Sequence, residues 1–299
     1  MTRTEVAFGS RGVTCRAWRY APDGGGGSKL RPCVVMAHGF GATREASLGP
    51  YAERFAAAGM HVLLFDYRHF GASDGKPRQL VSVRRQLQDY SAAVHFARAL
   101  SGIDPERVAV WGTSFSGGHA LVTAATVPGV AAAVCQCPMM DGLAAVANIL
   151  KYAGTGQLLR LTGHGLLDVA LAPFGRAHYV PTVGKPGTLA VMTSDDADEG
   201  YRKLAPPGFR FEVAARIGLT VGLYRPVRHA RDVRCPVLVQ VCEHDSVAPV
   251  ESSEQVIRLL GSLGDARRYP IGHFEPYFGA HFERSVTDQL AFLRRHLRP

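Results

Sequence analysis

Residues 107–125, RVAVWGTSFSGGHALVTAA, join an apolar run of the kind found in buried strands to a helical stretch of small residues. The run stops at Gly112 and the helix begins within a few positions, which leaves Ser114 at the junction. A tight turn between a strand and a helix holds a serine clear of its neighbours, and the positive end of the helix faces its hydroxyl oxygen. Because Gly117 and Gly118 let the helix approach a sheet closely, the stretch predicts a nucleophilic serine on a strand–turn–helix unit.

Upstream of this unit, short continuous apolar runs at 33–39 and 61–67 alternate with helical patterns at 46–58 and 80–100. Such runs are typical of strands buried on both faces, and the helices between them fit right-handed crossovers. The pattern therefore predicts an α/β fold with a mostly parallel central sheet flanked by helices.

Both ends of the chain extend this sheet. Residues 4–8 and 13–20 predict an opening antiparallel hairpin, and PDGGGGS at 22–28 predicts a flexible surface turn. The later elements expected in this sheet and its helices are a strand at 130–137, a strand within CPVLVQVCEHD (235–245), a helix at 250–260, a strand at 266–269 and a closing helix at 278–297.

The alternation is lost between residues 142 and 231. This segment carries helical patterns at 144–152, 157–171 and 209–219, separated by breaks rich in Gly and Pro, and it is longer than an ordinary connection. We therefore expect residues 142–231 to form a mainly helical cap, inserted into a core domain made of residues 1–141 and 232–299. Both ends of the insertion leave the sheet at one edge, so the cap is expected to cover that edge, exclude water and select the substrate.

Three polar residues follow predicted strands of this sheet. Ser114 follows the run at 107–112, Asp245 ends the run at 235–245, and His273 lies in the loop after 266–269. The carboxyl ends of parallel strands share one edge, so residues remote in sequence can meet there. The chain order Ser, Asp, His is the order of a hydrolase triad on an open α/β sheet.

The motifs around these residues resemble those of the α/β-hydrolase superfamily, in particular its bacterial serine esterase and serine aminopeptidase-like branch. HGFGATRE (38–45) is similar to the oxyanion loop, FDYRHFGASDG (65–75) to the turn after the fourth strand, and GTSFSGG (112–118) to the nucleophile elbow. CEHDSVAP (242–249) and GHFEPY (272–277) are similar to the loops that carry the acid and the base.

The resemblance implies a role for each residue. His273 would take the proton of Ser114 as general base, while Asp245 would fix the imidazole tautomer and stabilise the imidazolium. The backbone N–H groups of Phe40 and Phe115 would form the oxyanion hole.

Alternatives remain for several positions. Ser116 and His69 stand where the family pattern has glycine, and we expect Ser116 to loosen the helix packing slightly without loss of function. Ser116 is also the rival nucleophile, although its place in the first helical turn directs it to the sheet or to a cap. Asp141, after the strand at 130–137, is an alternative acid. His38 is expected to shape the oxyanion loop without titrating during the reaction.

The charge and cysteine content of the chain limit the kinds of ligand and macromolecule that it is expected to bind. The chain has 34 Lys and Arg against 25 Asp and Glu, for a net charge of +9, but the arginines are scattered and no nucleic-acid motif accompanies them. The six cysteines lie mostly in apolar runs, which favours buried thiols over disulfides or a metal. We therefore expect no metal, no nucleotide cofactor, no nucleic acid, no membrane span and a cytoplasmic location; a homodimer is left open.

These features together predict an enzyme that cleaves carboxylic esters, lactones included, through an acyl-enzyme. Phe40, Phe115, Met139 and Met140 are expected to flank the nucleophile and to favour an apolar acyl or alcohol group. The residues expected to bind the substrate are His38, Met139 and Met140. An amidase, peptidase, thioesterase or acyltransferase would use the same three residues. A ligand receptor on a hydrolase scaffold is the alternative outside catalysis.

Overall fold

The computed structural model describes residues 1–23 and 30–299, so most of the predicted turn at 22–28 lies outside the described residues. The described residues form an eight-stranded sheet in the order β1-β2-β4-β3-β5-β6-β9-β10. The hairpin β1–β2 is antiparallel, β2 runs antiparallel to β4, and the remaining neighbours are parallel. The strands span Thr2–Ser10 (β1), Val13–Ala21 (β2), Arg31–Ala37 (β3), His61–Phe65 (β4), Ile103–Thr113 (β5), Ala132–Gln136 (β6), Val237–Cys242 (β9) and Gly264–Tyr269 (β10).

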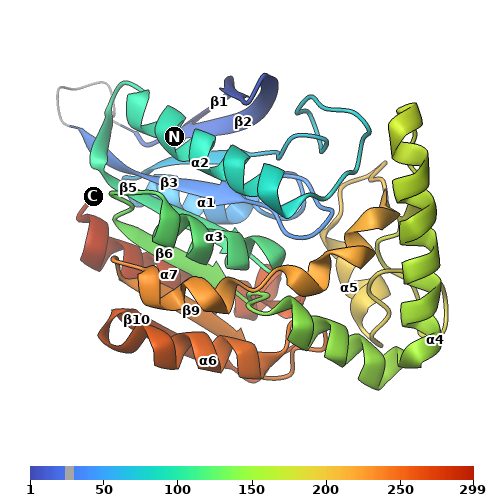
Figure 1. Ribbon diagram of the computed structural model, residues 1–299. Coiled ribbons are helices and arrows are strands. Elements are labelled where there is room, and N and C mark those ends of the chain that lie inside the picture. Colours follow the sequence, from blue (N-terminus) through green and yellow to red (C-terminus); the bar gives the residue numbers. More distant parts are fainter. Residues whose placement is uncertain (24–29) are drawn as a thin grey trace.

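Helices cover both faces of the sheet (Figure 1). Helices α1 (Gly49–Ala57) and α7 (Gly279–Leu297) pack on one face, and α2 (Val83–Ala99), α3 (Phe115–Thr126) and α6 (Val250–Leu260) pack on the other. Strand β3 shows why the strand sequences are continuously apolar: Val34 packs with the α1–α7 layer and Val35 with the α2–α3 layer. Successive side chains point to opposite faces, and both faces are buried. The predicted mostly parallel α/β sheet is confirmed.

The inserted segment, residues 142–231, follows β6. Most of it lies to one side of the sheet, and residues 226–231 return along α3 and α6 (Figure 1). Its elements are α4 (Gly142–Leu171), the 3-10 turn η1 (Ala172–Phe174), β7 (Tyr179–Pro181), α5 (Ala197–Leu204), β8 (Glu212–Ala214) and the 3-10 turns η2 (Ala215–Leu219), η3 (Val221–Leu223) and η4 (Pro226–Asp232). The 3-10 turn η5 (Gly261–Leu263) precedes β10, and η6 (Glu275–Tyr277) precedes α7.

Of the helical predictions in this segment, the first two are confirmed and the third needs correction. The patterns at 144–152 and 157–171 lie in the two helical parts of α4, which Gly154 separates with a non-helical backbone at φ 74°. The helix predicted at 209–219 is wrong, because its first half contains the strand β8, which pairs with β7, and its second half is the short η2. The alternating Phe209, Phe211 and Val213 fit the period of a strand.

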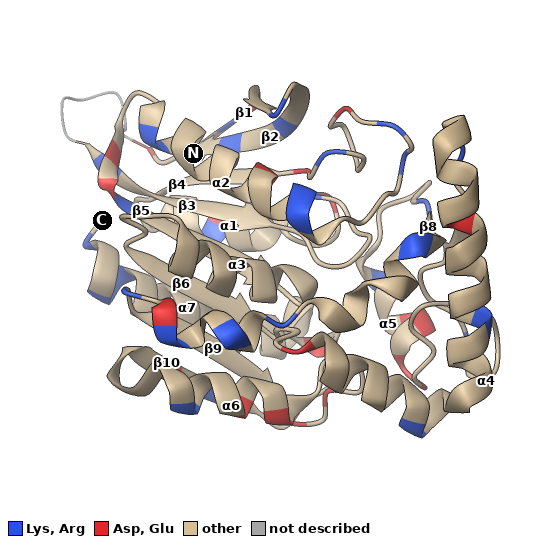
Figure 2. Ribbon diagram, in the orientation of Figure 1, with Lys and Arg blue, Asp and Glu red and all other residues tan. Residues whose placement is uncertain are grey.

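Charged side chains are spread over the ribbon and do not gather on one element (Figure 2). Within 1–23 and 30–299, no helix has both the length and the apolar character needed to cross a bilayer. All six cysteines are buried and free, as predicted.

Candidate active site

Ser114 occupies the sharp turn between β5 and α3. Its backbone has φ 54° and ψ −120°, in the left-handed region that a residue with a side chain seldom adopts. A Cβ on Gly112 would lie 1.8 Å from the Ser116 carbonyl oxygen, and one on Gly117 would lie 2.5 Å from Pro138. Helix α3 therefore approaches the sheet as closely as backbone allows, and the turn presents the Ser114 hydroxyl at the carboxyl edge of the strands.

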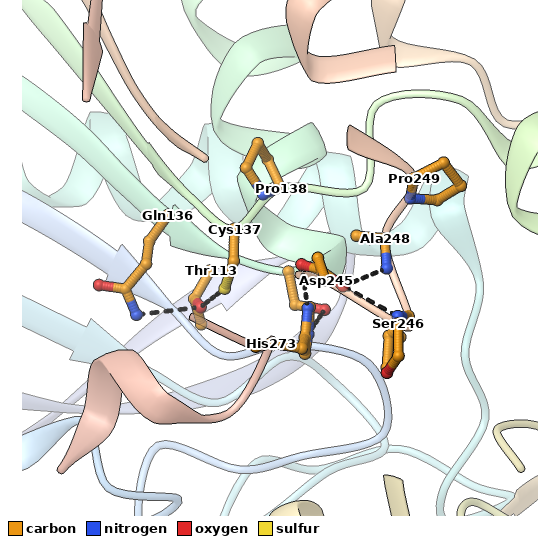
Figure 3. Close-up of polar contacts among 12 residues, drawn as sticks. Thr113, Gln136, Cys137, Pro138, Asp245, Ser246, Ala248, Pro249 and His273 are labelled. Atoms are coloured by element: carbon orange, nitrogen blue, oxygen red, sulfur yellow. Dashed lines mark hydrogen bonds and ion pairs between the residues drawn. The ribbon is translucent and has the colours of Figure 1, made fainter. Parts of the chain in front are cut away.

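His273 and Asp245 meet Ser114 at this edge. His273 Nδ1 lies 2.6 Å from Asp245 Oδ2 (Figure 3). On the other side of the ring, His273 Nε2 lies 3.0 Å from Ser114 Oγ. The other oxygen of Asp245, Oδ1, accepts hydrogen bonds from the backbone N–H groups of Val247 at 2.8 Å and Ala248 at 2.6 Å. The carboxylate is thus held in place and orients the imidazole so that Nε2 faces the serine hydroxyl. The structure brings together the three residues that the sequence singled out.

Burial and charge act in opposite directions on His273. Its side chain is 4% exposed and that of Asp245 is 3% exposed. Burial alone would lower the pKa of His273, but the negative charge and hydrogen bond of Asp245, together with charges at Cys137 and Asp196, raise this pKa to about 9. The imidazolium form is therefore stabilised, which suits a group that must accept a proton during a reaction.

Asp141 lies outside this arrangement. Its carboxylate accepts a hydrogen bond from Leu143 N at 2.9 Å at the start of α4 and forms an ion pair with Arg225 at 2.7 Å. It joins the first and last parts of the inserted segment. The partner of His273 is Asp245, and Asp141 has a structural position.

The loop 38–40 lies directly against the elbow. A Cβ on Gly39 would meet the Ser114 Cβ at 3.3 Å, and the rings of Phe40 and Phe115 contact edge to face with centroids 5.4 Å apart. The two residues expected to supply oxyanion donors are therefore neighbours beside Ser114. Burial lowers the pKa of His38 to about 4, so its imidazole is neutral, and its Nε2 accepts a hydrogen bond from Tyr67 N at 3.4 Å.

Ser116 ties the elbow to this loop. Its fully buried hydroxyl donates to the carbonyl of His38 and lies 2.8 Å from the Tyr67 hydroxyl. The Ser116 side chain therefore points into the core. These two contacts anchor the start of α3 to the loop 38–40 and to the turn after β4.

His69, the other departure from the family pattern, adopts the backbone that its position requires. Its φ of 75° is left-handed, which explains why glycine suits this turn. The imidazole lies 2.9 Å from Arg85, and burial lowers its pKa to about 4. In the same turn, Asp66 accepts a hydrogen bond from Arg44 N at 2.8 Å and so holds the end of the loop that begins at His38.

Sequence reasoning missed a residue of the inserted segment that reaches the site. The hydroxyl of Tyr201, on α5, donates to the carbonyl of Phe40 at 2.7 Å. Burial raises the pKa of Tyr201, so the hydroxyl stays protonated and remains a donor. Helix α5 was itself missed because it is short and contains Gly200, where a Cβ would lie 2.3 Å from the ring of Phe274. No motif marked Tyr201, since its contact depends on packing between distant segments.

A small cavity of about 30 Å³ adjoins Ser114, room for a water molecule or two. Its lining is mostly apolar, and Met192, Tyr201 and Leu204 contribute to it from the inserted segment. The other residues around it are His38, Gly39, Phe40, Ala42, Ala46, Leu48, Thr113, Ser114, His273, Phe274 and Tyr277.

The methionines predicted beside the nucleophile do not line this cavity. Met139 and Met140 are buried in the core, where Met139 N donates to the Ser114 carbonyl and the Met140 carbonyl accepts from Val227 N, each at 2.9 Å. The Met139 contact stabilises the backbone of the turn that carries Ser114, on the side away from the cavity. Among the described residues, no group of three or more His, Cys, Asp or Glu side chains is placed to hold a metal ion.

Comparisons with known proteins show the family to which the chain belongs. The family model described as serine aminopeptidase, S33, matches residues 28–272. The quorum-quenching protein AidA of Acinetobacter baumannii (strain MDR-ZJ06) is 42% identical over 296 residues, which cover 97% of this chain and 94% of the relative. The polyketide transferase grgF of a Penicillium species is 32% identical over 309 residues, covering 99% and 98%.

A solved structure is similar over the whole length. The crystal structure of the α/β-hydrolase GrgF from Penicillium sp. sh18 superposes with a TM-score of 0.85 at 24% identity, and all of each chain is covered. The chain belongs to the serine aminopeptidase S33 family of the α/β-hydrolase superfamily, and it is a serine hydrolase by that membership.

Proposed function

We propose that this protein hydrolyses carboxylic esters through an acyl-enzyme on Ser114 and that its substrates include lactones. The observation that carries the proposal is the chain of contacts from Asp245 through His273 to Ser114, with distances of 2.6 and 3.0 Å. The similarity to a protein named for quorum quenching favours an acylated lactone among the possible esters.

In the proposed reaction, Ser114 Oγ attacks the ester carbonyl while His273 Nε2 takes the hydroxyl proton. The negative oxygen of the tetrahedral intermediate binds to the backbone N–H groups of Phe40 and Phe115, where one such donor is worth about 3 kcal/mol. The C–O bond then breaks, and His273 returns the proton to the leaving alcohol. Water attacks the acyl-enzyme with His273 as base and releases the acid.

A lactone places a special demand on this site. Its leaving alcohol stays attached to the acyl group after the ring opens. The site must therefore hold both the acyl part and the attached alcohol until water attacks. A cavity of about 30 Å³ is too small for either part. We propose that residues 142–231 act as a cap and that Met192, Tyr201 and Leu204 move aside when a substrate enters.

Acyl transfer is the second candidate. It is favoured by the 32% identity to a protein named polyketide transferase. The same acyl-enzyme would form, and an alcohol, amine or carbanion would replace water in the second step. A ligand receptor is disfavoured because it needs no hydrogen-bonded Ser114, His273 and Asp245.

A matched panel tests these functions. The wild-type protein is assayed with a p-nitrophenyl ester, an N-acyl-homoserine lactone and the corresponding acyl amide. We expect a burst of p-nitrophenol, ring opening of the lactone to the hydroxy acid and no amide cleavage. Ester and lactone turnover that persists in Ser114→Ala, or no turnover in the wild type, would contradict the proposal. Product that forms only when an added alcohol or amine is present would assign acyl transfer.

A further inference from the structure

The second half of α4, residues 155–171, exposes an unusual amount of apolar surface. It forms the outer edge of the molecule, on the side of the inserted segment away from the sheet (Figure 1). Leu159 is 71% exposed and Leu166 is 59% exposed, and the neighbouring Leu167 is 45% exposed. Large apolar side chains gathered on one helix face mark an interaction surface more often than scattered ones do.

These residues follow a regular spacing. Gly156, Leu159, Gly163, Leu166 and Ala170 succeed one another in alternating steps of three and four, the spacing of a helix that packs along another helix. We call these five residues the outer seam of α4. The opposite face, which includes the buried Gln157, Leu161, Gly165 and Asp168, packs against the rest of the protein.

Packing within the monomer does not require a glycine at either of the two glycine positions of the outer seam. A Cβ on Gly156 or Gly163 would meet nothing within 4 Å, whereas one on Gly165 would lie 2.8 Å from Leu219. Gly165 thus allows close packing inside the chain, but Gly156 and Gly163 weaken the helix without such a contact. Glycines at a seam let a second helix approach closely and leave holes that larger side chains can fill.

The outer seam is complementary to itself in one orientation. If a second copy of the helix lies antiparallel and centred on position 161, Leu159 faces Gly163 of the copy and Leu166 faces Gly156. The four layers made by Gly156, Leu159, Gly163 and Leu166 then each combine a large residue with a small one, while Ala170 faces no residue of the outer seam of the copy. A parallel copy would place glycine opposite glycine and leucine opposite leucine, which alternates voids with crowded layers.

We propose that the outer seam of α4 is the interface of a two-fold symmetric homodimer, with the α4 helices of two copies packed antiparallel. A two-fold interface uses the same patch on both subunits, and four of the five residues of the outer seam meet that condition in reciprocal pairs. No charged side chain belongs to the outer seam, and Arg160 lies beside it, so the apolar contact can exclude water.

Sedimentation velocity on the full-length protein over a range of concentrations tests the proposal. We expect a dimer in the wild type and a monomer in the double variant Leu159→Lys/Leu166→Lys, with each single variant weakening association by about tenfold or more. Leu30→Lys, at a residue that is 47% exposed outside the inserted segment, is the matched control and should leave the dimer intact. A wild type that stays monomeric, including one that instead binds lipid vesicles, or a dimer that survives the double variant, would overturn the proposal.

Two further variants test the orientation. Gly163→Ala should stabilise the monomer against heat because it favours the helix, yet weaken the dimer because it fills the hole opposite Leu159. A mixture of Leu159→Cys and Gly163→Cys proteins should form a disulfide between the two variants on mild oxidation by oxidised glutathione, in preference to disulfides between identical chains. The native cysteines are all buried and do not compete. Preferential Leu159→Cys self-linking would contradict the antiparallel pairing.

Discussion

The carboxyl edge of the sheet and the inserted segment hold their residues in place by different means. At the edge, the turns after β5, β9 and β10 fix Ser114, Asp245 and His273 through backbone conformation and hydrogen bonds of 2.6 to 3.0 Å. The inserted segment reaches the same site with side chains that pack on it, and the hydroxyl of Tyr201 donates to the Phe40 carbonyl. The difference suggests that the reaction belongs to the edge and the choice of substrate to the insertion.

The contact between the two regions is nevertheless extensive. Asn148 on α4 donates to the Ser246 carbonyl at 2.8 Å, and the Ser246 hydroxyl bonds to Asp196, just before α5. The loop that carries Asp245 is therefore braced by the inserted segment. If that segment moves when a substrate enters, the movement would change the contacts of the loop that carries Asp245 as well as those of the loop 38–40.

The largest effect separates the two serines of the elbow. Ser114→Ala should lower kcat for ester hydrolysis on the order of 10⁶-fold, because the nucleophile is lost. Ser116→Ala should lower kcat by less than about tenfold and unfolding stability by about 1 kcal/mol, since it removes only a buried hydrogen bond. Steady-state kinetics and urea unfolding measure both, and comparable activity losses in the two variants would contradict the assignment.

The next effect separates the two carboxylates. Asp245→Asn should lower kcat on the order of 10⁴-fold, because the imidazole loses its tautomer control and its counter-charge. Asp141→Asn should retain most activity but lose stability, since Arg225 loses its charged partner while the asparagine can still cap α4. If Asp141→Asn proved the more damaging of the two for kcat, the acid would have to be reassigned.

The third effect is a dependence on pH. The pKa of His273 is raised to about 9, so below that pH the imidazole already holds a proton and cannot accept one from Ser114. We expect kcat/KM to rise with pH through the neutral range and to level off near pH 9, about tenfold per unit on the rising side. A profile centred at or below the usual histidine pKa would show that Asp245 does not stabilise the imidazolium in this way.

The smallest effect tests the link from the insertion. Tyr201→Phe should lower kcat about fivefold, the equivalent of about 1 kcal/mol, because the Phe40 carbonyl loses its donor and the oxyanion loop becomes less fixed. Met192→Leu, a change at another cavity residue that makes no such hydrogen bond, is the control and should affect KM more than kcat. Equal kcat values for Tyr201→Phe and the wild type would show that this hydrogen bond does not affect the reaction rate, and would leave substrate selection as the role of the inserted segment.

Sequence alone predicted the parts of the molecule that local patterns determine. The apolar runs gave the parallel strands, and the helix at 250–260 has the bounds of α6. The neighbourhood of Ser114, Asp245 and His273 followed from the rule that strands of a parallel sheet end at one edge.

Other features depend on contacts between distant segments and had no local signal. Helix α5 contains Gly200 because the ring of Phe274 lies against it, which weakens the helical pattern that sequence reasoning needs. Tyr201 and the burial of Met139 and Met140 followed from packing that no motif encodes. Ser116 appeared as a defect in the elbow pattern, and only its hydrogen bond to the His38 carbonyl shows what it contributes.

Labelling with a fluorophosphonate followed by peptide mass spectrometry tests the central claim most directly, because it reports the nucleophile without requiring the natural substrate. The account predicts one phosphonyl adduct, on Ser114, that forms faster as pH rises, disappears in Ser114→Ala and persists in Ser116→Ala. An adduct on Ser116, or a folded wild-type protein that takes up no label, would contradict it.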